Sequence, residues 1–145
     1  MNLDTLYQEV ILDHYKNPLN KKLSPTFDVQ VHHINTSCGD EITLNLTAVD
    51  GVITAITWDG VGCSISQASV SIASDLLMGK TFEQAQAISD EFVDLMQSKG
   101  KKVVDEKTLE DAVALAGVSQ YPARIKCALL GWMAIKDASI QSQTK

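Results

Sequence analysis

An alternation of apolar and polar residues in the first half of the chain constrains its fold more than any other feature. Apolar side chains occupy every second position over 27–31 and again over 42–48, a period of two that predicts strands with one buried face. Asp50-Gly51 is a strong hairpin signal and joins the second segment to a third, 52–58. The pattern predicts a three-stranded antiparallel meander with one face exposed to water.

Apolar residues at helical spacing flank these strands on both sides. The first helix is expected over 3–16, because the residue before Pro18 is disfavoured in the helical conformation. Later helices are expected at 65–77, from a capping box of Thr81 and Gln84 onward, at 108–116 before Gly117, and from Pro122 onward. This order predicts an α+β fold in which the helices pack on one face of the sheet, in a single domain spanning residues 1–145.

Charge and hydropathy exclude several classes of function. The net charge of −6 makes general nucleic-acid binding unfavourable, since that needs a basic face. No apolar run approaches the roughly 20 residues that span a bilayer, and the first residues do not form a secretory signal, so we expect a cytoplasmic protein. The basic cluster from Lys99 to Lys102 is either a solvated turn or a docking patch for an acidic partner.

Three cysteines raise the question of chemistry, because an odd number argues against a disulfide framework. Cys38 and Asp40 flank Gly39 in the turn between the first two strands. Cys63 precedes a helix, where the helix dipole lowers the pKa of a thiol. Cys127 lies near the start of the last helix. Together they could supply three thiolates and one carboxylate to zinc or to an iron–sulfur cluster, but their spacing alone leaves three unrelated thiols as an open alternative.

The remaining residues of interest have simpler interpretations. His32 and His33 point to opposite faces of a strand, and His14 lies on the first helix, so we expect structural or solvent-facing roles for all three. Arg124 lies three residues before Cys127 and therefore on the same helix face. It is either a surface charge or a group that stabilises an anionic thiolate or a persulfide.

Three segments of the chain resemble the U-type iron–sulfur cluster assembly family, to which the IscU and NifU N-terminal proteins belong. They are Leu6-Tyr7-x-Glu9-Val10-Ile11-x-Asp13-His14-Tyr15-x-Asn17-Pro18-x-Asn20, Asn35-x-x-Cys38-Gly39-Asp40 and Gly60-x-Gly62-Cys63-x-Ile65-Ser66-x-Ala68-Ser69. The similarity extends from about residue 3 to residue 135. It implies that the metal ligands of the family correspond to Cys38, Asp40, Cys63 and Cys127.

Within that family the chain is similar to the SufU branch. Lys126 stands where IscU-type scaffolds have a histidine, the segment from Tyr121 to Lys126 replaces their Leu-Pro-Pro-Val-Lys sequence, and residues 101–119 include additional chain. The resemblance implies a zinc protein that accepts persulfide sulfur from a SufS-like cysteine desulfurase. Cys38 would attack the persulfide, with Arg124 assisting, and the sulfur would pass to a downstream cluster scaffold or to apo-protein recipients.

Other functions use the same residues. A scaffold that assembles and transfers a [2Fe-2S] cluster would use the same four ligands, and Lys126 in place of a histidine favours sulfur transfer over this alternative. A stand-alone cysteine hydrolase needs a histidine base, which no motif provides. A purely structural zinc domain without sulfur chemistry would tolerate the substitution Asp40→Asn.

Overall fold

The computed structural model describes residues 3–101 and 105–144, and side chains from residue 5 onward. Lys102, part of the predicted basic cluster, and residues 102–104 of the additional chain lie outside the described residues. The elements in chain order are α1 (Leu3–Lys16), β1 (Val29–Asn35), β2 (Asp40–Val49), β3 (Val52–Val61), α2 (Ser64–Leu77), α3 (Phe82–Gln97), α4 (Glu106–Leu109), the 3₁₀ helix η1 (Glu110–Gln120) and α5 (Pro122–Gln143).

The sheet is the predicted antiparallel meander, with strand order β1-β2-β3. Leu44, at its centre, pairs with Val31 on one side and with Trp58 on the other. Asp50 and Gly51 both have positive φ, 52° and 80°, as a tight two-residue turn between twisted strands requires. Strand β1 begins at Val29, two residues later than the alternation predicted, since Phe27 is exposed and unpaired with β2 in the ladder. Strands β1 and β3 end later than predicted, and both reach the end of the sheet where the cysteines lie.

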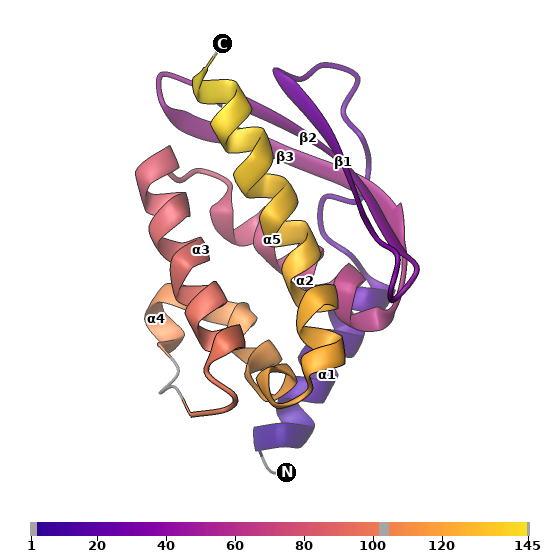
Figure 1. Ribbon diagram of the computed structural model, residues 1–145. Coiled ribbons are helices and arrows are strands. Elements are labelled where there is room, and N and C mark those ends of the chain that lie inside the picture. Colours follow the sequence, from indigo (N-terminus) through magenta and orange to yellow (C-terminus); the bar gives the residue numbers. More distant parts are fainter. Residues whose placement is uncertain (1–2, 102–104, 145) are drawn as a thin grey trace.

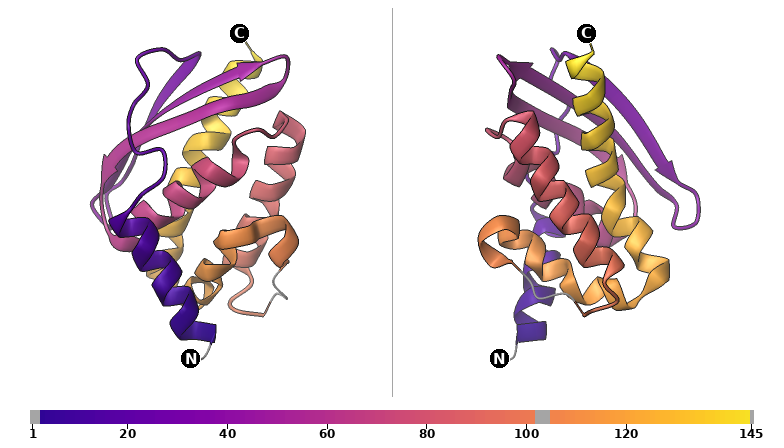
Figure 2. Two further views of the ribbon diagram at one scale, coloured as in Figure 1. Left: turned by 180° about the vertical axis from the view of Figure 1, so that it is seen from behind. Right: turned by 60° about the vertical axis from the view of Figure 1, so that its left-hand side comes forward.

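All the helices that contact the sheet pack on one face of it, as predicted (Figure 1). Helix α5 crosses β1 and β2, and α2 lies against β3. No described helix covers the outer face, but the segment between α1 and β1 crosses part of it (Figure 2), where Ser24 hydrogen-bonds to Asn45 and Thr57. Among the described helices, none is long and apolar enough to cross a membrane.

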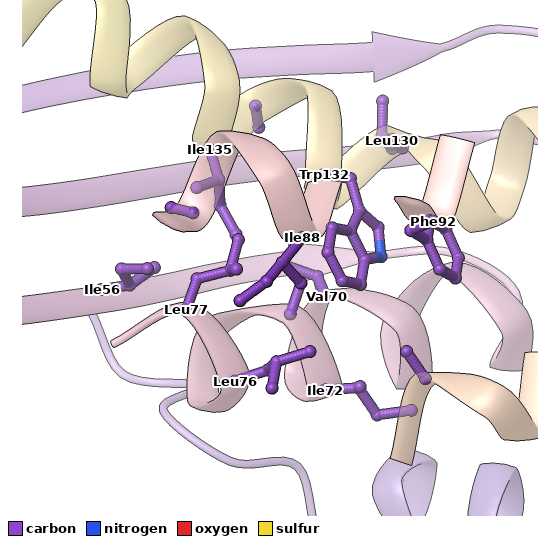
Figure 3. Close-up of a cluster of buried hydrophobic side chains, with 14 of the residues drawn as sticks. Ile56, Val70, Ile72, Leu76, Leu77, Ile88, Phe92, Leu130, Trp132 and Ile135 are labelled. Atoms are coloured by element: carbon purple, nitrogen blue, oxygen red, sulfur yellow. The ribbon is translucent and has the colours of Figure 1, made fainter. Parts of the chain in front are cut away.

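The core lies between the sheet and helices α2, α3 and α5 (Figure 3). The rings of Phe92 and Trp132 stack with centroids 4.3 Å apart and planes inclined by 9°, which joins α3 to α5. Gly131 allows α5 to approach α2, since a Cβ there would lie 2.6 Å from the Cβ of Val70. This close packing fixes α5, and with it Cys127, relative to the rest of the molecule.

Two helix starts were predicted correctly and one helix was not. Thr81 and Gln84 form a reciprocal capping box at the start of α3, and Pro122 begins α5. The predicted helix 108–116 is instead the short α4 followed by η1, which continues past Gly117 to Gln120. Glu110 has a φ of +46°, which ends α4, and the small apolar residues that follow are buried in the tighter 3₁₀ conformation.

Candidate metal centre

Three of the predicted ligands converge at one end of the sheet. The β1–β2 turn carries Cys38, the first residue of β2 is Asp40, and the second turn of α5 carries Cys127. Their ligand atoms all lie within 4.8 Å of one another, and the Sγ atoms of Cys127 and Cys38 are 2.6 Å apart. In Figure 1 this turn lies beside the first turns of α2 and α5. The structure therefore brings together side chains that lie up to 89 positions apart in the sequence.

Asp40 is fully buried, and its two carboxylate oxygens have different surroundings. Oδ1 accepts a hydrogen bond of 2.9 Å from the backbone N–H of Cys63. Oδ2 is buried without any hydrogen-bond partner among the described residues. A buried carboxylate oxygen without a donor is unfavourable, and a cation held jointly with the neighbouring thiols would satisfy it. The donor set of this site therefore fits a metal ion that accepts sulfur and oxygen ligands.

The backbone N–H of Cys63 joins it to the group through Asp40, and its sulfur lies near enough to Cys127 to raise the pKa of that thiol. It is the N-cap residue of α2, and its side chain makes no capping hydrogen bond, so the thiol is not used to satisfy the helix end. It lies outside the group of three ligands that share the 4.8 Å limit. Gly62 allows the close approach, since a Cβ there would contact the Asp40 carboxylate and lie 2.7 Å from Ser66 Oγ.

The thiol of Cys127 is held in its neutral form when no cation is present. Burial raises its pKa well above the ordinary value, and the hydrogen bond to the sulfur of Cys38 raises it further. The nearby Cys63 thiol and the Asp40 carboxylate act in the same direction. A site of this kind opposes negative charge on Cys127 until a cation compensates for it, which couples thiol deprotonation to metal binding.

Arg124 lies close to the site in the chain, but its side chain is exposed. No ion pair joins it to another described residue, and Lys126 is exposed as well. The group of α5 that touches the thiols is the carbonyl oxygen of Ala123, 3.7 Å from Cys38 Sγ and 3.9 Å from Cys127 Sγ. No sequence pattern could indicate this contact, because a backbone oxygen is common to every residue.

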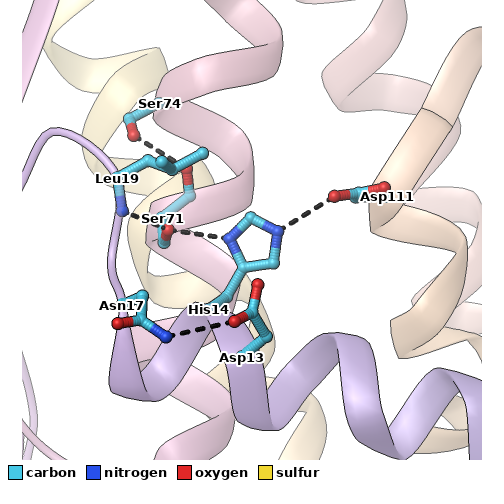
Figure 4. A network of polar contacts seen from close by, with 7 residues as sticks. All are labelled: Asp13, His14, Asn17, Leu19, Ser71, Ser74 and Asp111. Carbon is cyan, nitrogen blue, oxygen red and sulfur yellow. Dashed lines mark hydrogen bonds and ion pairs between the residues drawn. The ribbon is translucent and has the colours of Figure 1, made fainter.

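The histidines have partners outside the cysteine site. His14 is buried and joins Ser71 on α2 to Asp111 on η1, with distances of 2.9 Å and 3.0 Å (Figure 4). His33 contacts Asp137 at 2.8 Å. His32 contacts Thr43 and Glu41 on the neighbouring strand. The expected structural roles of the three histidines agree with these contacts.

An open groove of about 350 Å³ begins next to the site and was not predicted. Ile65, two residues after Cys63, and Tyr121, which is 63% exposed, both line it. Tyr7 and Ile11 contribute from α1, and Val118 contributes from η1. The groove combines residues from separate elements, each of which has an unremarkable local pattern, so it could not be found from the sequence.

Comparison with known proteins identifies the family. The sequence model of a protein family, described as the NifU-like N terminal domain, matches residues 6–128. The zinc-dependent sulfurtransferase SufU of Bacillus subtilis is 46% identical over 136 residues, which cover 93% of this chain and 90% of the relative. The iron-sulfur cluster assembly scaffold protein IscU of Streptococcus pyogenes is 39% identical, with 94% and 84% covered.

A solved structure agrees with these matches in sequence. A proposed iron-sulfur cluster assembly scaffold protein for the SUF system from Fervidobacterium islandicum AW-1 superposes with a TM-score of 0.84 and 30% identity, covering 95% of this chain and 99% of that chain. The resemblance inferred from the three sequence segments is thereby confirmed: this chain belongs to the family of NifU-like N-terminal domains.

Proposed function

We propose that this protein accepts sulfur from a cysteine desulfurase during iron–sulfur cluster assembly and that Cys38, Asp40, Cys63 and Cys127 hold a zinc ion. The observation that carries the proposal is the buried Oδ2 of Asp40, which has no described partner and lies beside two thiols. The similarity to the zinc-dependent sulfurtransferase SufU supports the choice of metal and of reaction.

The four residues differ in how firmly the fold holds them, and this suggests their roles. Cys127 is buried on α5, Asp40 is buried at the start of β2, and Cys63 is fixed at the N-cap of α2. Cys38 is only partly buried and lies on a turn. We therefore assign Cys38 as the residue that leaves the metal and reacts, while the other three retain it.

The reaction requires a nucleophilic sulfur at Cys38. Zinc, when bound, would keep its cysteine ligands deprotonated at neutral pH without adding redox chemistry. The Cys38 thiolate would attack the outer sulfur of the desulfurase persulfide. The new S–S bond forms on Cys38 as the bond within the donor persulfide breaks, and the donor cysteine leaves as a thiolate. Arg124, exposed on the first turn of α5, would stabilise the negative charge carried through this exchange.

The groove lined by Ile65 and Tyr121 is the surface we assign to the desulfurase. It is open, partly apolar and lined by Ile65, two residues after Cys63, and by Tyr121, which directly precedes α5. We expect a partner seated there to bring its own cysteine toward Cys38. A SufS-like enzyme would be the donor, and a downstream scaffold or apo-protein would receive the sulfur. Since the site needs free thiols, we place the reaction in the reducing cytoplasm.

Assembly of a [2Fe-2S] cluster on the same ligands is the second candidate. Its support is the similarity to IscU of Streptococcus pyogenes, a scaffold protein by name. Lys126, where IscU-type scaffolds have a histidine, favours sulfur transfer, because a lysine ammonium is not a ligand for iron.

Metal analysis under anaerobic conditions separates these functions. The protein, purified without chelators, is assayed for zinc, iron and acid-labile sulfide alongside Cys63→Ala and, as a control, Ser64→Ala, which alters an exposed neighbour. Sulfur transfer predicts equimolar zinc, no sulfide, loss of zinc only in Cys63→Ala, and stimulation of a cysteine desulfurase by the zinc form. Matching amounts of iron and sulfide would instead favour the scaffold. Absence of both metals would refute the site.

A further inference from the structure

Two of the site's thiols are placed to react with each other. Cys38 Sγ and Cys127 Sγ lie 2.6 Å apart, and both cysteines are free thiols. A disulfide requires the sulfur atoms to approach to about 2.05 Å, so only a small movement separates the pair from bonding distance. Cys63, by contrast, lies outside the group in which these two thiols meet.

The movement would fall on the β1–β2 turn. Cys127 is fully buried on a helix packed into the core, whereas Cys38 is partly buried. The next residue, Gly39, has a φ of +69° and nothing within 4 Å of the position of a Cβ. The turn therefore has both backbone freedom and space, so Cys38 can close the remaining distance while Cys127 stays in place.

We propose that Cys38 and Cys127 form a reversible intramolecular disulfide on exposure to a peroxide and that Cys63 remains reduced. The more accessible Cys38 attacks one peroxide oxygen. The O–O bond breaks, water leaves and Cys38 becomes a sulfenic acid. The thiol of Cys127 then attacks this sulfur and its proton passes to the departing hydroxyl group, so that the S–O bond breaks, the S–S bond forms and a second water leaves. The two thiols lose two electrons, and the peroxide gains them.

The consequence for function rests on the proposed metal site. The disulfide removes two of four ligands, one of them the sulfur acceptor, so the oxidised protein would neither hold zinc tightly nor accept sulfur. Because a thiol reductant restores both cysteines, the inactivation would be reversible. The fixed Cys127 would protect Cys38 from irreversible oxidation by capturing the sulfenic acid before a second peroxide reacts with it.

Peptide mapping of the oxidised full-length protein tests the pairing. The protein is treated with an equimolar amount of hydrogen peroxide in the presence of a chelator, so that the result does not depend on its metal content. Unreacted thiols are alkylated, and the protein is digested without reduction. We expect a linked peptide pair containing Cys38 and Cys127, alkylation of Cys63 alone, a fall from three free thiols to one, and full recovery after dithiothreitol.

Variants and alternative products make the test decisive. Cys63→Ser should still form the link, whereas Cys38→Ser should not. A sulfinic acid on Cys38, a link that includes Cys63, or a dimer joined between chains would each overturn the inference. Zinc content and desulfurase stimulation are measured beforehand on the reduced protein. If the reduced protein binds zinc and stimulates the desulfurase but the Cys38–Cys127 link does not form, the disulfide proposal is refuted and the proposed function stands.

Discussion

Among single residues, Asp40 offers the most direct test of the proposed metal site, through the substitution Asp40→Asn. Asparagine there keeps an oxygen to accept the Cys63 N–H but removes the negative charge next to the thiols. We expect the affinity for zinc, measured by competition with a chromophoric chelator, to fall at least about tenfold, as is seen when even a supporting group of a metal site is removed. Asp59→Asn is the control, since Asp59 is exposed and its acceptor oxygen is likewise preserved. Equal affinities in both variants would favour an inert site.

Two glycines near the site should respond differently to alanine. At Gly62 the new methyl group would contact the Asp40 carboxylate, so we expect Gly62→Ala to lower the free energy of unfolding by about 1–3 kcal/mol and to weaken metal binding. At Gly39 there is open space, and the positive φ alone should cost about 1–2 kcal/mol. Chemical denaturation and chelator competition measure the two effects. Unchanged metal binding in Gly62→Ala would contradict the close contact with Asp40.

The residues of the site could be predicted only in part. Turn and helix-start positions made Cys38, Asp40, Cys63 and Cys127 candidates, but their spacing left unrelated thiols open, and only the resemblance to a family joined them. The reason is physical: Cys38 and Cys127 are 89 positions apart, and their meeting depends on how α5 packs across the sheet. The orphaned Oδ2 of Asp40 likewise follows from burial, which single-residue patterns do not encode.

At the scale of elements, His14 joins three helices. Its ring contacts Ser71 on α2 and Asp111 on η1, and Ser71 also accepts a hydrogen bond from the N–H of Leu19. Because the contact with Ser71 is buried, we expect His14→Ala to lower the free energy of unfolding by about 2 kcal/mol. Asp111 is mostly exposed, so Asp111→Asn should change the free energy of unfolding by about 0.5 kcal/mol or less. If urea denaturation showed that His14→Ala and Asp111→Asn lower the free energy of unfolding equally, the Ser71 contact would not be the main stabilising contact of His14.

The link between β1 and α5 predicts a pH dependence. A hydrogen bond from His33 chiefly, and one from Gln141, lower the pKa of Asp137 below its ordinary value of 3.8. A carboxylate with a lower pKa in the folded state stabilises the fold above its unfolded pKa, and that stability is lost as the pH falls below 3.8. Since the carboxylate is 41% exposed, the contribution should be under about 1 kcal/mol.

Comparison of wild type with Asp137→Asn over the acid range measures this contribution. The free energy of unfolding should differ between the two proteins at pH values above about 4, and the difference should shrink in more acidic solution. A difference that stayed constant through that range would contradict the assignment of the stabilising effect to the ionised carboxylate.

Elements with a regular period were predictable, and the irregular one was not. Alternation placed the meander, the capping box placed the start of α3, and Pro122 placed the start of α5. The segment 110–120 has apolar and small residues that suit an α-helix, yet it forms η1 because its residues must fill the space between α1, α2 and α3. Tertiary packing decided the local structure where intrinsic preference was weak.

On the scale of the whole molecule, the metal site should couple to global stability. The ligands we propose come from the sheet and its β1–β2 turn, from the start of α2 and from α5, which do not approach one another in the unfolded chain. Binding to the folded state alone raises the free energy of unfolding by about 2.7 kcal/mol when free metal is at 100 times its dissociation constant. For a chain of this length that corresponds to a rise in Tm of about 5–10 °C.

The variant Cys38→Ala distinguishes stabilisation by bound metal from any change in stability caused by altered side-chain packing. The turn that carries Cys38 is open to solvent near Gly39, so the metal-free variant should melt close to the metal-free wild type. Adding zinc should raise the Tm of the wild type and of Ser64→Ala by the same amount, and the rise should be much smaller in Cys38→Ala because one ligand is missing. Calorimetric scans with zinc and with a chelator measure all three proteins. An undiminished rise in Cys38→Ala would place the zinc on other residues and remove the physical basis for Cys38 as the ligand that is released to accept sulfur.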